Sequence, residues 1–585
     1  MLGRWVLFGW LLLSGQSWAV PEDFKTTAEL SGFRETGRYS EVERLCRLYV
    51  ERWPKQVACQ TFGLTPEGRP MLALVVSRSG VLSPARAKTD RLPVVLIQGG
   101  IHAGEIDGKD AGFLAVREML EADHPALSKV VLVFVPVFNV DGHERFGAWN
   151  RPNQVGPDQM GWRVTGQNLN LNRDYAKAES PEMLAMLGLL GQWDPILYVD
   201  LHVTDGAQFQ PDVAILVEPK FVGDPNLQPL GRALQTDVNR LLQTQGSQPL
   251  GFYPSLQDHR DPASGFSDGA YTPRFSTGYW ALRNRLAVLV ETHSWKDFGR
   301  RVAITRNAIV DLLEVSASCG PTWLNAAEQA DRNSLALGGK ELVLAFKTTD
   351  KHKMIDFPGY AYRHFWSPLS GQRALAYDPK TPQNWRIPFY DEVVPSLIGR
   401  APAGGYLVGP AQAGWLGPRL AAHGIRYEVL AESLPEQRLE VFRADHVEFA
   451  KRPFEGHMTA SLSGRWSREL HQLPTGSLFI PIAQPGSRLI AALLEPTAPD
   501  SWASWGFFNA FFERKEYMEE YVAEAVAAQM LATRPEVAAE FRQRLAADPD
   551  FARSSEARLD FFYRRHPSWD QRFNLYPVMR IDHRP

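Results

Sequence analysis

Residues 92–105 read LPVVLIQGGIHAGE, and this stretch decides the fold. Its first half, 92–98, is an apolar run with the length of a buried strand, and it stops at a pair of glycines. His102 and Glu105 follow directly, three residues apart. Because ligands of α/β proteins gather at the carboxyl ends of the strands, the stretch predicts a sheet with a functional site at its edge.

The same alternation of strand-like and helix-like segments continues to about residue 320. Further apolar runs predict strands at 130–138, 196–201 and 286–290. Helices are predicted at 109–121, at 181–193 and at 301–316. Ser180 is a suitable N-cap for the second of these helices, and Pro181 fits its first position. The alternation predicts an α/β fold with a mostly parallel sheet covered by helices on both faces.

The chain from about residue 325 onward has a different pattern. It suggests a small strand-helix-strand unit within 406–430, mainly strands at 439–481, and a helical region that starts near 511 and runs through 522. The aromatic run at 505–509 fits either plain core packing or an accessory wall of a site. Since 585 residues exceed one ordinary core, we expect a first domain at 20–322 and a C-terminal accessory region of mixed α and β structure at 323–585.

The charge balance gives no reason to expect nucleic acid or an anionic membrane as a partner. Sixty-three basic residues nearly balance 66 acidic ones, which leaves a net charge of −3. The hydrophobic fraction of 44% and the charged fraction of 22% are ordinary for a globular protein.

The first residues are typical of a signal peptide. Arg4 supplies a positive start, residues 5–13 form an apolar run, and residues 17–19 place small side chains where a signal peptidase reads them. The alternative is a membrane anchor, but the run is shorter than the roughly 20 apolar residues that a bilayer needs. We therefore expect a signal peptide at 1–19, no membrane span after its cleavage, and a protein that is exported and either periplasmic or secreted.

The three cysteines are too few for a disulfide scaffold or a thiolate zinc site. Cys46 and Cys59 could pair in an oxidising compartment, although their spacing alone does not show that the geometry fits. Cys319 is left over and is expected to be a buried thiol.

The residues with metal-binding chemistry are His102, Glu105 and His202. Zinc accepts imidazole nitrogen and carboxylate oxygen, and a catalytic zinc keeps one position open for water. His202 ends the third predicted strand, the right place for a site residue in an α/β sheet. Alone, an H-x-x-E pattern can arise by chance and a strand-end histidine can simply pack. Together the three residues predict a site for one Zn²⁺ ion.

Three further positions complete a candidate site. Glu291 ends the fourth predicted strand, where a carboxylate is costly unless it serves a site or is paired, so it is either a general base or a salt-bridged residue. Arg151 and the pair Asn172-Arg173 could bind a carboxylate or polarise a carbonyl. The alternative is that these residues lie on the surface of ordinary loops.

The residues resemble the zinc carboxypeptidase family typified by pancreatic carboxypeptidase A. That family carries H-x-x-E, a separate arginine, an Asn-Arg pair, a later histidine and a glutamate on a late strand, and the order in this chain is His102 and Glu105, Arg151, Asn172 and Arg173, His202, Glu291. Residues 63–70, GLTPEGRP, and 139–142, NVDG, resemble two flanking motifs, the second with valine in place of proline. The resemblance covers residues 40–320 and indicates an exported, bacterial-type member with an additional C-terminal region.

The resemblance implies an α/β/α sandwich with a mixed sheet, and it implies a role for each site residue. His102, Glu105 and His202 are the zinc ligands, Glu291 is the general acid/base, and Arg151 stabilises the oxyanion. Asn172 and Arg173 grip the terminal carboxylate of the substrate. The family also has a mobile tyrosine that closes the site; Tyr271 and Tyr279 both remain candidates here.

The expected function is that of a metallocarboxypeptidase that hydrolyses the C-terminal peptide bond through zinc-activated water. The expected substrate is a peptide, or a small acylated amino acid, with a free carboxylate. Two alternatives remain open. One is a zinc-dependent deacylase or cell-wall peptide amidase on the same scaffold. The other is a non-catalytic peptide-binding protein, although no ligand and no base is missing.

Overall fold

The centre of the N-terminal half is an eight-stranded sheet. The computed structural model describes residues 22–585, so the predicted signal peptide at 1–19 lies outside the described residues. The strand order is β1-β2-β4-β3-β5-β9-β6-β7. The bounds are β1 Val57–Leu64, β2 Pro70–Val76, β3 Val94–Gln98, β4 Val131–Val135, β5 Leu197–Val203, β6 Val213–Glu218, β7 Pro249–Leu250 and β9 Leu286–Thr292.

Strand direction confirms the predicted fold class. The four neighbours β4, β3, β5 and β9 run parallel, while β2 and β6 pair antiparallel on either side of them. All residues of β3, β4, β5 and β9 are buried, which explains why the sequence shows them as unbroken apolar runs rather than alternating ones. The sheet is therefore mixed but mostly parallel.

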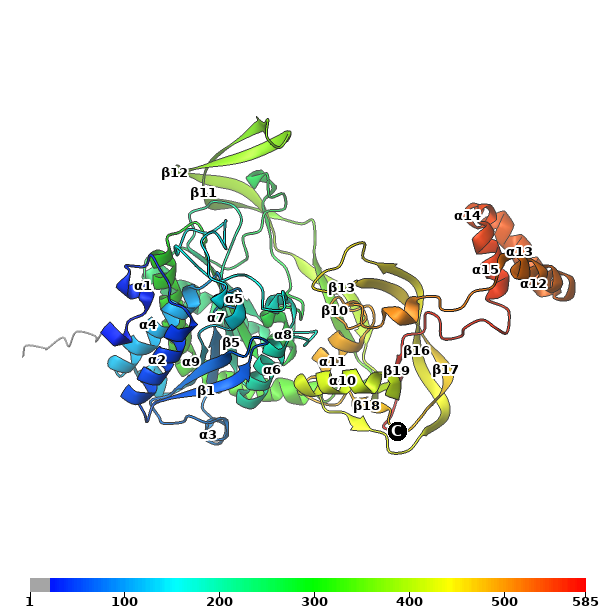
Figure 1. Ribbon diagram of the computed structural model, residues 1–585, viewed down its shortest axis with the longest axis horizontal. Coiled ribbons are helices and arrows are strands. Elements are labelled where there is room, and N and C mark those ends of the chain that lie inside the picture. Colours follow the sequence, from blue (N-terminus) through cyan, green and yellow to red (C-terminus); the bar gives the residue numbers. More distant parts are fainter. Residues whose placement is uncertain (1–21) are drawn as a thin grey trace, which may run out of the picture.

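Helices pack against this sheet and against each other (Figure 1). The main ones are α2 Tyr39–Arg52, α4 Asp107–Glu121, α6 Pro181–Trp193, α7 Gln228–Thr244, α8 Ser276–Leu282 and α9 Phe298–Ser334. The predicted start of α6 is confirmed, because the Ser180 hydroxyl accepts a hydrogen bond from the Met183 N–H at 3.2 Å.

Helix α9 is much longer than the segment 301–316 predicted from the sequence. It continues through Pro321, and its buried face extends to Trp323, Ala327 and Ala330. Tertiary packing therefore outweighs the hydrogen bond that the proline removes. The helix runs across residue 322, and the division of the chain into 20–322 and 323–585 stays a prediction.

The C-terminal region is rich in strands. The long hairpin of β11 Lys353–Ser367 and β12 Gln372–Tyr390 projects from the molecule (Figure 1). Strands β10 Glu341–Thr348 and β13 Val393–Arg400 pair with each other. A six-stranded sheet has the order β15-β18-β14-β19-β16-β17. Its strands are β14 Gly405–Val408, β15 Glu428–Val429, β16 Leu434–Phe449, β17 Ala460–Leu473, β18 Leu478–Pro481 and β19 Val578–Ile581.

The helices of this region only partly follow the predictions. The strand-helix-strand unit is present as β14, α10 Pro410–Ala422 and β15, although β15 has just two residues. Helix α11 Ser487–Leu494 packs on α8. The continuous helical region expected over 511–522 is wrong: residues 513–519 are irregular and mostly exposed. A charged segment without a buried face gains no packing to hold a helix. Four helices follow at the far end of the molecule (Figure 1): α12 Glu520–Thr533, α13 Pro535–Ala547, α14 Pro549–Arg553 and α15 Ser555–Tyr563.

Two features bear on the chemistry of the chain as a whole. Cys46 on α2 and Cys59 on β1 form a disulfide with a Cα–Cα distance of 5.9 Å, whereas Cys319, expected to be buried, is a half-buried free thiol. Within residues 22–585, no helix is both long enough and apolar enough to cross a membrane.

Candidate metal and substrate site

The parallel strands bring the predicted site residues to one edge of the sheet. His102 and Glu105 lie in the turn between β3 and α4, and His202 and Glu291 lie near the carboxyl ends of β5 and β9. In the parallel register of these two strands, His202 is the direct partner of Glu291. Neighbouring partners in a sheet project to the same face, so the sheet places the third predicted ligand beside the predicted base.

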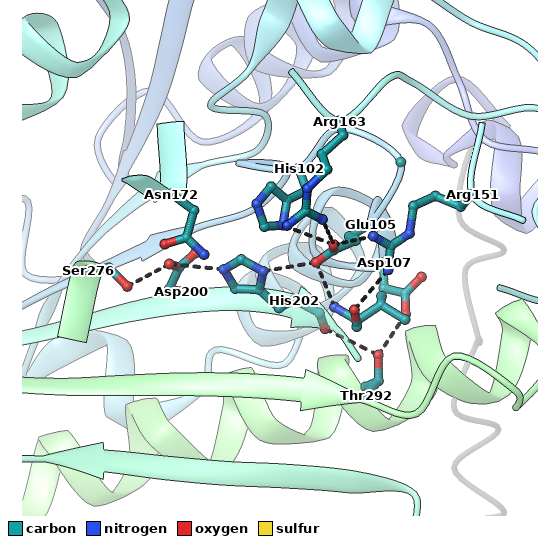
Figure 2. Close-up of polar contacts among 12 residues, drawn as sticks. His102, Glu105, Asp107, Arg151, Arg163, Asn172, Asp200, His202, Ser276 and Thr292 are labelled. Carbon is teal, nitrogen blue, oxygen red and sulfur yellow. Dashed lines mark hydrogen bonds and ion pairs between the residues drawn. The ribbon is translucent and has the colours of Figure 1, made fainter. Parts of the chain in front are cut away.

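The three predicted ligands converge on one point (Figure 2). The Nδ1 atom of His102 lies 2.9 Å from one Glu105 carboxylate oxygen, and the Nδ1 atom of His202 lies 2.9 Å from the other. One donor atom from each residue falls within 4.8 Å of the others, and all three side chains are buried. Two imidazoles and a carboxylate are a donor set that suits zinc.

The outer nitrogen of each imidazole faces an oxygen acceptor. His102 Nε2 lies 3.1 Å from Asn170 Oδ1, and His202 Nε2 lies 3.1 Å from Asp200 Oδ2. Asp200 also accepts hydrogen bonds from Gln98 and Ser276. A proton on His102 Nε2 satisfies Asn170 and leaves the Nδ1 lone pair directed at the centre, while Asp200 lies at ion-pair distance from His202. Acceptors of this kind orient metal-binding histidines, so the surroundings fit a metal as well as the ligands do.

The surroundings shift the pKa of each of the three residues. Burial raises the pKa of Glu105, but Arg151 and His102 outweigh it and hold the pKa well below its usual value. Burial lowers the pKa of His202, but Asp200 and Glu105 outweigh it and hold the pKa well above its usual value. Burial lowers the pKa of His102 to about 4. Glu105 is therefore the anionic member of the cluster.

Glu291 is a buried carboxyl group that forms no salt bridge with residues 22–585. Its pKa is raised to about 8, mainly by burial; the Glu105 and Asp200 carboxylates also raise the pKa, while His202 and Arg151 lower it. Its Oε2 atom has no hydrogen-bond partner among residues 22–585. The alternative of a salt-bridged carboxylate is therefore not what the structure contains, and a carboxyl with a raised pKa in a cleft is suited to proton transfer.

A cavity of about 270 Å³ contains all seven predicted site residues. Arg151 lies 2.7 Å from Glu105 through Nη1 and donates a hydrogen bond to the Val203 carbonyl through Nη2. Arg173 stacks over the Phe275 ring at 4.7 Å. Asn172 Oδ1 is buried and has no partner within the described part of the chain. The guanidinium of Arg173 and the amide N–H groups of Asn172 are the donors here that a carboxylate-bearing ligand could use.

The structure also separates the two candidate tyrosines that the sequence left open. Tyr271 lines the cavity, whereas Tyr279 is buried elsewhere with its hydroxyl 3.0 Å from His423 Nδ1. His293, which follows Glu291 by two residues, stacks on Phe209 at 3.8 Å and is not among the residues that line the cavity.

Several site residues escaped the sequence analysis. Arg163 lies 3.4 Å from Glu105, and Tyr253 lines the cavity. Asn170 and Asp200 hold the two histidines. Arg163 and Tyr253 come from loops without any motif. Asp200 and Asn170 could have been recognised as site residues from the sequence. Asp200 is a charged residue in an otherwise apolar strand, and Asn170 lies two residues before the Asn-Arg pair.

The two flanking motifs meet in space. Thr65 and Arg69 of the turn between β1 and β2 contact the Asp141 carboxylate, the hydroxyl at 2.7 Å and the guanidinium at 2.6 Å. These contacts join the first hairpin to the segment after β4. Neither motif contributes a residue to the lining of the cavity.

Comparison with known proteins agrees with this geometry. Residues 42–213 match the family model described as zinc carboxypeptidase. Carboxypeptidase 2 of Trichophyton tonsurans and that of Trichophyton equinum are each 22% identical over 472 residues, which cover 75% of this chain and 78% of theirs.

Similar solved structures include two bacterial enzymes. The metallo-carboxypeptidase from Burkholderia cenocepacia is 17% identical with a TM-score of 0.34, and the match covers 46% of this chain and 68% of that one. The metallo-carboxypeptidase from Pseudomonas aeruginosa, in complex with (2-guanidinoethylmercapto)succinic acid, is 16% identical with a TM-score of 0.33, covering 49% and 69%.

An α/β sheet with a His-Glu-His cluster at its edge defines a metallopeptidase. The family match over residues 42–213 and the curated relatives indicate a metallopeptidase that is similar to the zinc carboxypeptidases.

Proposed function

We propose that the protein is a metallocarboxypeptidase that removes the C-terminal residue of peptides, with one zinc ion held by His102, Glu105 and His202. The observation that carries the proposal is the cavity of about 270 Å³, which joins these three ligands to a buried Glu291 and to the Asn172-Arg173 pair. A metal site, a base and a carboxylate-binding pair in one cleft are what the hydrolysis of a terminal peptide bond requires.

When bound, zinc acidifies a water molecule and polarises a carbonyl. Glu291 accepts a proton from the attacking water and returns it to the leaving amine. Its position beside His202 in the sheet register places it at the metal edge of the cavity. Its burial and its unpartnered Oε2 keep it available for the proton.

The arginines have separate parts in this mechanism. Arg151, anchored to the Val203 carbonyl, stabilises negative charge that develops on the carbonyl oxygen. Arg173 and Asn172 bind the terminal carboxylate, and the Phe275 ring beneath Arg173 holds its guanidinium in place. Burial lowers the pKa of Arg173, as expected for a guanidinium that waits for an anionic partner.

The experiment that tests the function compares three substrates: a peptide with a free C-terminus, the same peptide amidated, and an N-acyl amino acid. Amidation removes the charge that Arg173 pairs with, so cleavage should fall by roughly 10-fold or more. Arg173→Ala should weaken this discrimination. Equal cleavage of the free and amidated peptides would contradict the exopeptidase proposal. Preference for the N-acyl amino acid would favour the deacylase.

Metal dependence is tested separately. Dialysis against a strong chelator should abolish activity, and Zn²⁺ should restore it, with metal content measured at each step. One equivalent of zinc per chain is expected. Activity that persists after confirmed metal loss would require a different mechanism.

We also propose that the protein is exported to the periplasm or secreted. The disulfide between Cys46 and Cys59 supports this, because such bonds persist in oxidising compartments. N-terminal sequencing of the mature protein should begin at Val20. A protein that keeps residues 1–19 would contradict cleavage.

A further inference from the structure

The C-terminal region reaches the active site through one tight turn. Glu455 and Gly456 form the tip of the loop between β16 and β17, closed by backbone hydrogen bonds of 2.8 and 3.0 Å between Phe454 and His457. The Glu455 carboxylate accepts a hydrogen bond of 2.9 Å from the Asn170 N–H. Residues 285 positions apart in sequence are thereby joined beside the metal ligands.

Asn170 is a junction between the metal and substrate parts of the site. Its side-chain oxygen faces His102 Nε2 at 3.1 Å and accepts a hydrogen bond of 3.0 Å from the Asn172 N–H. It caps the short turn Leu171–Arg173, which presents Asn172 and Arg173 to the cavity. Whatever holds the backbone of Asn170 therefore influences both a metal ligand and the carboxylate-binding pair.

The turn carries a backbone conformation that glutamate seldom adopts. Glu455 has a φ of +50° and Gly456 one of +79°. Two consecutive positive φ values favour asparagine followed by glycine, because asparagine tolerates the left-handed region better than glutamate does. An unfavourable residue retained at a loop tip suggests that its side chain has a task.

Neighbouring contacts hold this turn against the catalytic half. His457 Nε2 lies 2.7 Å from Glu179, and Phe454 stacks on Trp505 at 5.8 Å. Trp505 in turn lies under Lys177 and Arg274. Trp505 of the aromatic run thus packs behind the turn, and none of residues 505–509 lines the cavity.

Two carboxylates of the C-terminal region also have an electrostatic effect on Arg173. The Asp500 carboxylate accepts hydrogen bonds from the backbone N–H of Arg274 at 2.9 Å and from Nε of Arg274 at 2.7 Å. Burial is the main effect that lowers the pKa of Arg173, and the two carboxylates that oppose it, Glu455 and Asp500, both belong to the C-terminal region. Glu455 and Asp500 thus partly offset the effect of burial on the pKa of Arg173.

We propose that Glu455 is a positioning residue of the active site: it clamps the loop 170–173 and, through Asn170, holds His102 and the Asn172-Arg173 pair in register. This inference rests on the proposed metallocarboxypeptidase function. According to this inference, the C-terminal region contributes a residue that positions the active site.

The variant Glu455→Asn distinguishes a positioning role of this side chain from a structural role of the turn. Asparagine suits the left-handed turn, so the thermal unfolding midpoint should stay equal or rise, but its shorter side chain cannot reach the Asn170 N–H. Zinc affinity, measured on the apoprotein by competition with a chromophoric chelator, should fall about 10-fold. The KM for a free-C-terminus peptide should also rise about 10-fold. Glu455→Gln keeps an acceptor on a side chain of the same length, so its zinc affinity and its KM should stay close to those of the wild type.

Glu448→Asn is the matched control, because Glu448 is an exposed residue of β16 in the same hairpin. Glu448→Asn should change neither the zinc affinity nor the KM. Unchanged zinc affinity and KM in Glu455→Asn would overturn the proposal. So would a loss of zinc affinity that occurs only with a lower unfolding midpoint, since that would mark a merely structural turn. Zinc competition needs no substrate, so a wild-type protein that binds zinc without cleaving peptides would overturn the proposed function and leave this test intact.

Discussion

At the scale of single residues, the site is an arrangement of buried charges that balance one another. Glu105 lies between two imidazoles and two guanidinium groups, while Glu291, one strand away from His202, has no such partner. The same residue type therefore has opposite properties at two nearby positions: the pKa of Glu105 is held low and that of Glu291 is raised. The first suits a metal ligand and the second suits a proton carrier.

Replacing Glu291 with glutamine should separate these properties. The substitution keeps the size of the side chain and removes the proton acceptor, so kcat should fall by about 10²–10⁴-fold while zinc content stays at the wild-type level. Steady-state kinetics and metal analysis of the purified variant provide the measurement. Near-normal turnover would place the base elsewhere in the cavity.

Glu218, at the end of β6, gives a residue-scale prediction about pH. Burial raises its pKa to about 7, against the opposing N–H groups of Lys220 and Phe221. Between about pH 4.5 and pH 7 the folded state binds a proton that the unfolded state has lost, so the contribution of Glu218 to stability is full below that window and falls as the pH rises through it.

Glu218→Gln cannot ionise, so its stability relative to wild type should increase from pH 5 to pH 8, by at most about 3 kcal/mol. Urea unfolding midpoints at the two pH values measure the difference. The exposed Glu436→Gln should show no such trend, and a Glu218→Gln difference that is flat with pH would refute the assignment.

At the scale of elements, helix α9 ties several parts of the catalytic half together. Arg301 near its start is fully buried and forms an ion pair of 2.9 Å with Asp107, the first residue of α4. Its remaining guanidinium hydrogens go to the carbonyls of Val155, Gly156 and Lys296. The helix that follows β9 is thereby joined to the helix that follows the His102-Glu105 turn.

Arg301→Ala should therefore be strongly destabilising. It leaves the Asp107 carboxylate buried without its charge partner, a change that typically costs about 3–5 kcal/mol. Arg332→Ala on the same helix is the control, since Arg332 is exposed and should change stability by less than about 0.5 kcal/mol. Thermal and urea unfolding of both variants test this, and similar stabilities would show that the buried pair is dispensable.

At the scale of the whole molecule, the main hydrophobic core extends from the N-terminal half into the C-terminal region. The buried cluster that contains the catalytic strands also contains Tyr406, Leu489 and Trp502 of the C-terminal region. Residues 520–563 have a separate small core, in keeping with their position at the far end of the molecule (Figure 1). The two halves are therefore packed as one body, although their sheets are distinct.

A chain that ends at residue 335 should fail to give a soluble, active enzyme. The truncation keeps every predicted site residue and the whole of α9, but it uncovers apolar surface that the C-terminal region buries and removes Glu455 and Asp500 from the site. Size-exclusion chromatography and peptidase assays provide the measurement. A monomeric truncated chain with full activity would contradict the interpretation that the two halves share the main core.

The sequence by itself determined the class of fold and the centre of the site. Buried parallel strands appear as unbroken apolar runs, so β3, β4, β5 and β9 could be located from local pattern alone. The ligands and Glu291 could be found as well, because each directly ends or follows such a strand and the edge of a parallel sheet collects such residues.

The tertiary structure alone decided which groups surround this centre. Arg163, Tyr253 and Glu455 come from loops whose positions depend on packing between distant segments, which no local periodicity encodes. The choice of Tyr271 over Tyr279 as the cavity-lining tyrosine has the same origin, as does the extension of α9 past Pro321. Local pattern specifies an element and the end at which chemistry can lie, whereas long-range packing specifies which side chains meet there.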